Sequence, residues 1–138
     1  MDKKKDLANK LRSSGLRPTK QRLRIAEYLF NRSKTFHFSV ENLDKVINKK
    51  GSEEKIALAT IYNTVNAFKK AGHLKEILLK EGRSYFDTNT TAHHHFYDSD
   101  TNELIDIRFN EIEVTKLPHP PKGKQIKDLE VVIGLKKI

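Results

Sequence analysis

The segment 57–86 constrains the fold of this 138-residue chain most strongly, because a helix pattern passes directly into a hairpin pattern. In "ALATIYNTVNAFKKAGHL", Ile61, Val65 and Phe68 share one helical face, and the pattern ends at Gly72. The runs "LKEILLK" and "SYFDT", with a short turn between them, predict two antiparallel strands. A chain with this order has to pack a helix against a small sheet.

Three shorter helices are predicted upstream. The first spans Leu7 to Leu11 and stops at Ser14-Gly15, and the second is "TKQRLRIAEYLFNR". The third, "VENLDKVINKKG", follows Ser39, a residue type that favours the N-cap. Apolar residues at helical spacing define the inner faces of the second and third helices: Leu23, Ala26, Leu29 and Phe30, then Leu43, Val46 and Ile47.

Helices followed by a two-stranded hairpin form the layout of a winged helix-turn-helix DNA-binding domain, expected over residues 1–87. The last helix would enter the major groove, and the tip of the hairpin would contact phosphate. A solvated polar face is the alternative for this helix. The residues assigned to DNA binding are Arg17, Arg22, Thr60, Tyr62, Asn63, Asn66, Lys70, Lys80 and Arg83.

Residues 88–138 have a different pattern and predict a small α/β dimerisation domain. Two strand-like runs surround a polar turn in "HHHFYDSDTNELIDIRF". A short helix in "NEIEVTKL" would stop at Pro118, and "QIKDLEVVIGLKKI" would form a final strand. The fold class is therefore α+β. Apolar edges around residues 131–133 are safer when another subunit covers them, so we expect a homodimer.

The composition limits the classes of function. A net charge of +9 favours a polyanionic partner such as double-stranded DNA, against the alternative of a generic basic surface. Without cysteine, disulfides, thiol catalysis and a structural zinc site built on cysteines are excluded. There is no apolar run of membrane-spanning length and no secretory signal, so we expect a cytoplasmic protein with no membrane partner.

The run of three histidines lies in a predicted strand, where alternate side chains share a face. His93 and His95 would therefore point one way, toward Asp106 on the returning strand. With His37 and Asp87, these residues would supply nitrogen and oxygen ligands for iron(II), manganese(II) or zinc at a hinge between the domains. The alternative is a solvated histidine strand.

An enzyme must also be considered, because two histidines and a carboxylate can form an open catalytic metal site. The sequence has no HExxH motif, no nucleophile beside a base and no glycine-rich phosphate loop. We therefore do not expect an enzyme.

Five segments in this order resemble the ferric uptake regulator family of dimeric winged-helix metalloregulators. They are "GLRPTKQRLRIAEYL", "HFSVENL", "LATIYNTVNAFKKAGHL", "GRSYFD" and "HHHFYDSDTNELIDI". The histidine triplet before Phe-Tyr and the lack of cysteine look most like the haem-responsive iron response regulator subgroup. The resemblance implies a repressor-type transcription regulator of iron or haem homeostasis. The alternatives are a regulator that senses manganese, zinc or peroxide, and a non-haem metalloenzyme.

The resemblance also implies roles for particular residues. The family's regulatory metal site falls on His37, Asp87, His93, His95 and Asp106. A second metal site, or a haem site, would use His94 and Glu113, although Leu129 stands where the family has another histidine. His119 is a spare candidate for haem. Asp98 and Thr101 replace the first zinc-binding cysteine pair, and Asn63 replaces a common recognition-helix arginine.

Overall fold

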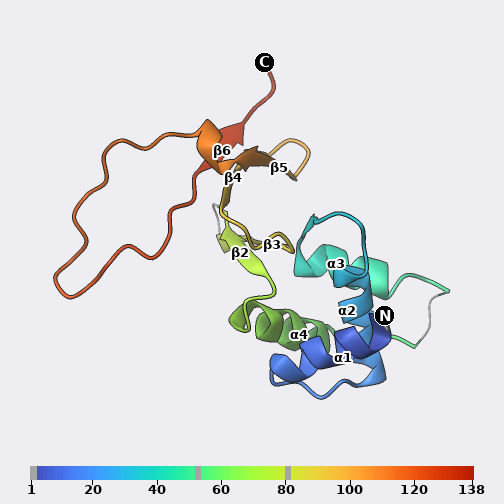
Figure 1. Cartoon of the computed structure of the whole chain (residues 1–138). Coiled ribbons are helices and arrows are strands. Elements are labelled where there is room, and N and C mark those ends of the chain that lie inside the picture. The colour runs from blue at the N-terminus through green and yellow to red at the C-terminus, as the bar shows by residue number, and fades with distance from the viewer. Residues whose placement is uncertain (1–2, 52–53, 80–81) are drawn as a thin grey trace. The chain divides into compact units, whose positions relative to one another are not determined.

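The computed structural model describes residues 3–51, 54–79 and 82–138, and the chain divides into two compact units, Met1–Thr90 and Thr91–Ile138. In the described part of the first unit, helices pack together beside a small sheet, and in the second unit a sheet carries a long irregular loop (Figure 1). No helix among the described residues is both long and apolar enough to cross a bilayer.

The first unit contains the helices and strands that the sequence predicts, with one addition. Its elements are α1 (Lys3–Ser13), α2 (Lys20–Phe30), β1 (His37–Phe38), α3 (Val40–Ile47), α4 (Leu58–Lys70), β2 (Lys75–Leu78) and β3 (Ser84–Asp87). The side chains of Thr19 and Ser39 accept hydrogen bonds from backbone N–H groups in the first turns of α2 and α3. Both predicted helix starts are therefore confirmed.

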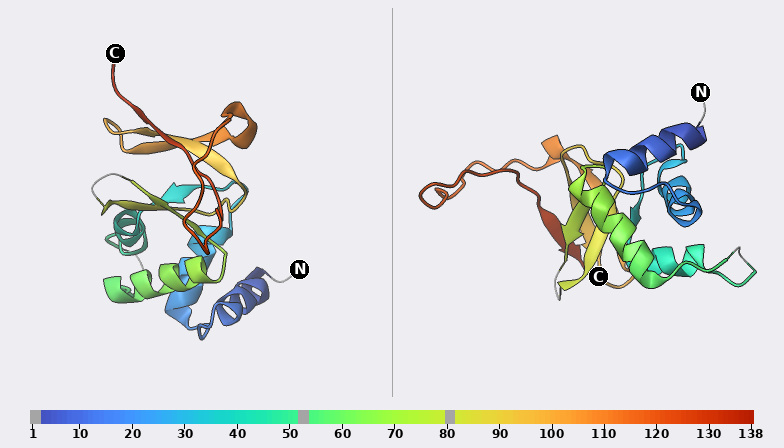
Figure 2. Two further views of the ribbon diagram at one scale, coloured as in Figure 1. Left: turned by 90° about the vertical axis from the view of Figure 1, so that its left-hand side faces the viewer. Right: turned by 90° about the horizontal axis from the view of Figure 1, so that it is seen from below.

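A helical core holds the first unit together. Helix α1 packs on α2, while α2 and α3 both pack on α4, as the two views of Figure 2 show. The predicted inner face of α4 is confirmed, because Ile61, Val65 and Phe68 are fully buried. Burying a side chain the size of Phe68 stabilises a fold by roughly 1.5–3 kcal/mol, so this face fixes the rotation of α4 about its axis.

The inner face predicted for α3 is wrong at one position. Leu43 and Ile47 are buried, but Val46 is 40% exposed and Val40 takes its place in the core. The helix has only eight residues, and Val40, Leu43 and Ile47 follow the three-to-four-residue spacing of one face. Val46 lies one residue outside that stripe. It was assigned to the inner face only because it is apolar.

The hairpin of β2 and β3 is confirmed, and a strand that the sequence did not indicate joins it. The sheet order is β1-β3-β2, with all neighbours antiparallel. In β1, His37 is the register partner of Asp87, and Phe38 is the partner of Phe86. A two-residue strand leaves no periodic pattern in a sequence, so β1 could not be predicted.

The second unit is a three-stranded sheet with the order β5-β4-β6. Its strands are β4 (His93–Asp98), β5 (Glu103–Arg108) and β6 (Val132–Leu135). The predicted hairpin is confirmed, with His95 opposite Asp106 and the turn closing through Asn102 at a φ of 59°. Strand β6 pairs in parallel with the other edge of β4, so β4 is the central strand.

Two predictions in the second unit are corrected. The expected helix at 110–117 is only the 3₁₀ turn η2 (Phe109–Glu111), and an extended loop follows it (Figure 1). Ile112, Val114 and Thr115 are β-branched and have low helix propensity, and few apolar residues are available to pack a short helix. The final strand covers only residues 132–135 of the predicted 125–138.

The C-terminal end of α4 is fixed by a histidine in an aromatic environment. His73 contacts the rings of Phe30 and Phe68 edge-on, and its Nε2 lies 3.2 Å from Ser13 Oγ of α1. The Lys10 ammonium lies 4.0 Å from the Phe30 ring centroid. Burial, and then the nearby charge of Lys10, lower the pKa of His73 below its usual value.

This lowered pKa predicts acid sensitivity of the first unit. The unfolded chain binds a proton at His73 near pH 6.5, whereas the folded chain binds it only at lower pH. The contribution of His73 to the free energy of unfolding is therefore complete above about pH 6.5 and decreases as the pH falls below that value. We expect His73→Gln to reduce the stability difference between pH 7.5 and 5.5, measured by urea unfolding. His119→Gln, in an exposed loop, is the control and should leave that difference unchanged.

Candidate functional site

One pair of candidate ligands lies in the first unit. The His37 Nε2 atom is 3.2 Å from Asp87 Oδ2, and Asp87 is buried. The pair exists because β1 places His37 directly across from the last residue of β3. The other carboxylate oxygen of Asp87 accepts the N–H of Asn89 at 2.8 Å, which closes the turn after the strand.

Three further candidates come together in the second unit, as the alternating faces of a strand predict. His93 Nε2 and His95 Nε2 lie 3.4 and 3.3 Å from the same oxygen of Asp106, Oδ1. The two rings are neighbours, with centroids 4.4 Å apart. Both histidines are buried, whereas Asp106 is 46% exposed.

The hydrogen bonds on the far side of each ring determine what these three groups can hold. His93 Nδ1 lies 2.7 Å from the Thr91 carbonyl oxygen, and His95 Nδ1 lies 2.9 Å from a Glu130 carboxylate oxygen. Both partners accept hydrogen bonds, so each Nδ1 carries a proton. In a neutral ring, Nε2 then carries a lone pair. Two such lone pairs facing a carboxylate form a donor set for a cation, and a divalent metal fits it.

In His94, the two ring nitrogens have the opposite roles. The backbone N–H of Val131 donates to its Nδ1 at 2.9 Å, and its ring stacks on Phe109 with centroids 5.0 Å apart. The Nδ1 lone pair is therefore engaged, and Nε2 of the neutral ring carries the proton. Among the described residues His94 belongs to no potential metal-binding group, and neither does Glu113, which is exposed.

The outward face of α4 has the character expected for contact with nucleic acid. Asn63, Asn66 and Lys70 are exposed on the side opposite the core. Together with Ser13 and Ser14 at the end of α1, they line a shallow hollow of about 320 Å³. Amide side chains can form paired hydrogen bonds with adenine edges in a major groove.

The other predicted DNA contacts have different degrees of exposure. Tyr62 is 47% exposed, Arg17 and Arg83 are exposed, and Arg22 and Thr60 are half-buried. Arg22 donates to the Arg17 carbonyl oxygen at 3.2 Å, which links two of the predicted cations across the start of α2. Lys80, assigned to the wing, lies outside the described residues.

Two contacts that the sequence does not indicate restrain α4 on its exposed side. The Tyr62 hydroxyl donates to a Glu41 carboxylate oxygen at 2.9 Å, and this bond raises the pKa of Tyr62. Lys69 donates to Glu76 on β2 at 2.7 Å, and this bond lowers the pKa of Glu76. An exposed ion pair such as Lys69–Glu76 typically contributes less than about 1 kcal/mol to stability, so it acts mainly on orientation. Each restrains a long side chain beside the polar face of the helix.

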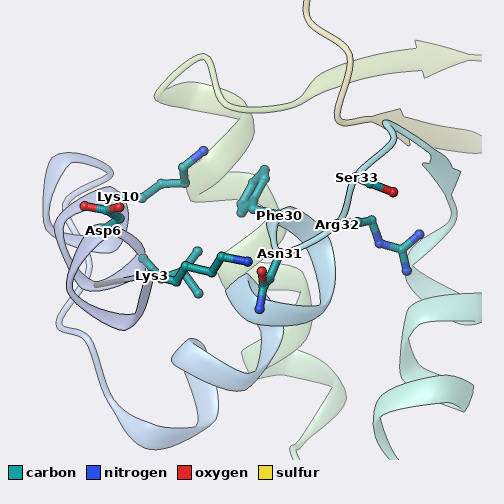
Figure 3. A pocket seen from close by; sticks show the side chains of 8 residues that line it. Lys3, Asp6, Lys10, Phe30, Asn31, Arg32 and Ser33 are labelled. Carbon is teal, nitrogen blue, oxygen red and sulfur yellow. The ribbon is translucent and has the colours of Figure 1, made fainter. Parts of the chain in front are cut away.

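A basic pocket of about 470 Å³ opens between α1 and the end of α2 (Figure 3). Lys3, Lys10, Arg32 and Asp6 are among its lining residues, and none of the candidate ligands is. Arg32 stacks on Phe36, with its guanidinium carbon 3.5 Å from the ring centroid.

A winged-helix unit followed by a small sheet with histidine and aspartate donors defines the class of metal-responsive DNA-binding regulators. The sequence profile of the Ferric uptake regulator family matches residues 13–133. The chain therefore belongs to the ferric uptake regulator family, whose members are transcriptional regulators and not enzymes.

Individual relatives support this membership. The peroxide-responsive repressor PerR of Staphylococcus aureus (strain Mu50) is 33% identical over 106 residues, covering 75% of this chain and 69% of the relative. The peroxide operon regulator of Bacillus subtilis (strain 168) is 29% identical, covering 76% and 70%. The ferric uptake regulator of Pseudomonas aeruginosa with manganese superimposes with a TM-score of 0.65 at 27% identity, covering 94% of this chain and 96% of that one.

The hydrogen bond to His94 predicts a structural role for this histidine. In His94→Ala, the Val131 N–H loses its acceptor and Phe109 loses its stacking partner, so we expect a loss of about 1–3 kcal/mol in the free energy of unfolding. Chemical denaturation monitored by circular dichroism measures this loss. His119→Ala, in the exposed loop, should change stability by less than about 0.5 kcal/mol. Equal stability of the two variants would contradict the assignment.

Proposed function

We propose that this protein is a sequence-specific DNA-binding transcription regulator that responds to a divalent metal ion. The observation that carries the proposal is the convergence of the His93 and His95 Nε2 atoms on Asp106, with both Nδ1 atoms already bonded elsewhere. Membership of a family of transcriptional regulators supports it. The first unit would bind DNA, and the second would mediate dimerisation and sensing.

We further propose that His37 and Asp87 complete the coordination of the same ion. Asp87 ends β3 and His93 begins β4, so only five residues separate the two ligands. Six residue steps of extended chain span at most about 20 Å, which keeps both donor sets within reach of one ion. Three imidazoles and two carboxylates then provide the mixed nitrogen and oxygen set that suits iron(II), manganese(II) or zinc.

An ion bound by both units would act as a switch because it restricts their relative orientation. In a dimer, this orientation sets the distance between the two recognition helices, and their spacing decides whether both enter successive major grooves. The ion has to bind one arrangement more tightly than the other. A preference of about 1.4 kcal/mol changes operator affinity tenfold. Operator binding also implies that the protein acts in the cytoplasm.

The divalent metal ion itself is the first candidate for the effector that this regulator senses. The relatives include peroxide-responsive repressors, and a solved relative carries manganese, so metal-dependent peroxide sensing is the second candidate. The resemblance to haem-responsive regulators makes haem a third candidate effector. His94 could ligate haem through Nδ1 only after releasing the Val131 N–H. A Soret shift that disappears in His94→Ala would support haem binding at this residue.

Metal titration of single histidine variants tests the proposed centre. His93→Ala and His95→Ala each remove a nitrogen ligand, so we expect Mn²⁺ affinity to fall at least about tenfold. His94→Ala removes no proposed ligand, so its loss of Mn²⁺ affinity should be much smaller and limited to the indirect effect of losing the Val131 contact. Isothermal titration calorimetry at neutral pH gives the three affinities. Equal losses in all three variants would indicate a nonspecific histidine surface.

Fluorescence anisotropy with promoter fragments from the source genome tests DNA recognition. Tyr62→Ala should reduce the preference for an operator over random DNA, because this side chain flanks the proposed base-reading face. Arg83→Ala should weaken binding to all DNA and reduce the salt slope of log K by about 0.9, the value for one lost phosphate contact. Lys116→Ala, in the loop of the second unit, is the charge-matched control. Absence of any promoter preference, with or without Mn²⁺, would overturn the regulator proposal.

A further inference from the structure

Glu130 lies beside the candidate metal centre, although the sequence pattern gave no sign of it. Its Oε1 atom accepts a hydrogen bond from His95 Nδ1 at 2.9 Å. The His95 side chain is completely buried and that of Glu130 is 18% exposed, so this bond is largely shielded from water. Glu130 does not face Asp106 directly but contacts the opposite edge of the His95 ring.

This contact fixes which nitrogen His95 can offer to a cation. A carboxylate accepts hydrogen bonds, so Glu130 holds the proton on Nδ1 and leaves the lone pair on Nε2, the atom that lies 3.3 Å from Asp106. A carboxylate bonded to the far nitrogen of a metal-binding histidine fixes both its tautomer and its ring orientation. Losing such a partner typically costs 10–100-fold in metal affinity.

The two metal-facing histidines differ in how they are held. His93 Nδ1 is bonded to the carbonyl oxygen of Thr91, two residues away, so this bond is local to the start of β4. His95 depends on Glu130, which is 35 residues later in the chain. The orientation of His95 therefore depends on where the C-terminal segment lies.

Glu130 and Val131 bind the histidine run as a unit. Besides the Glu130 contact, the backbone N–H of His95 donates to the Val131 carbonyl oxygen at 3.1 Å, and the Val131 N–H donates to His94 Nδ1 at 2.9 Å. Strand β6 begins at the next residue, Val132, which is the register partner of His95. Adjacent residues of the C-terminal segment thus contact adjacent histidines, on opposite faces of β4.

We propose that Glu130 is a positioning residue for the metal centre and that it couples metal binding to the pairing of β6 with β4. This inference rests on the proposed metal-responsive function. Metal binding requires the His95 orientation that Glu130 maintains, and Glu130 occupies its place only when the segment before β6 is bound to β4. By reciprocity, a bound ion stabilises the pairing of β6 as much as that pairing strengthens metal binding.

Glutamate variants of the full-length protein test the positioning role, with Co²⁺ as the probe because its absorption spectrum reports the ligand geometry. Glu130→Ala removes the acceptor, and we expect it to weaken Co²⁺ binding 10–100-fold and to alter the absorption bands. Glu130→Gln retains an oxygen that accepts a hydrogen bond without the charge, so its affinity should be intermediate. Asp128→Ala removes a carboxylate from the same segment at an exposed position and should bind Co²⁺ as the unaltered protein does.

Hydrogen exchange tests the coupling. In the unaltered protein, Mn²⁺ should slow exchange of the amides in Val132–Leu135, whereas in Glu130→Ala the ion should slow it much less. A purely structural contact would change exchange equally with and without the ion. If Glu130→Ala does not fold, as judged by circular dichroism, the isosteric Glu130→Gln variant provides the same comparison.

The outcomes separate this inference from the function on which it rests. If the unaltered protein binds neither Co²⁺ nor Mn²⁺, the proposed function fails and the role of Glu130 fails with it. If the unaltered protein binds metal and both Glu130 variants bind it equally well, the proposed function stands and the positioning role is overturned. Equal losses in Glu130→Ala and Asp128→Ala would also overturn it, because the effect would then be one of charge in the segment.

Discussion

The central position of β4 in its sheet is the constraint on which the second unit depends. Strand β5 pairs with one edge of β4 and β6 with the other, so the backbone polar groups of the histidine run are largely used in the sheet. The side chains then have to alternate between two faces. His93 and His95 share the face of Asp106, and His94 lies on the other, where Phe109 and Val131 engage it. Backbone geometry thus places three chemically identical residues on two faces, and the partners on each face give them different roles.

The central strand of the first unit, β3, also brings candidate metal ligands together. Strand β3 follows directly on the turn of the hairpin, and its last residue is Asp87. One four-residue strand therefore runs from the proposed DNA-contacting wing to a candidate metal ligand. The pairing of β1 with β3 brings His37 to this ligand. Under the proposed function, a change in the coordination of Asp87 would act on a strand that also leads to the wing.

The sequence by itself determined the features that depend on local periodicity and capping. The apolar stripe of α4 and the alternation within the histidine run were predictable because both follow from the repeat of a helix or a strand. The helix starts at Thr19 and Ser39 were predictable because a hydroxyl side chain can accept a backbone N–H of the first turn. The short helix predicted before Pro118 does not form. Its β-branched residues have low helix propensity, and few other contacts stabilise a helix there.

Only the tertiary structure decided the contacts between distant segments. Three examples are the pairing of β1 with β3, the Tyr62–Glu41 bond and the Glu130–His95 bond. Each joins residues that are far apart in the sequence and that no helix or strand repeat relates. The tautomers of the three histidines belong to this group too, because the partner of each Nδ1 sets the position of its proton. Sequence spacing can place an imidazole on a face, but the atom that it presents there depends on the neighbours supplied by the rest of the fold.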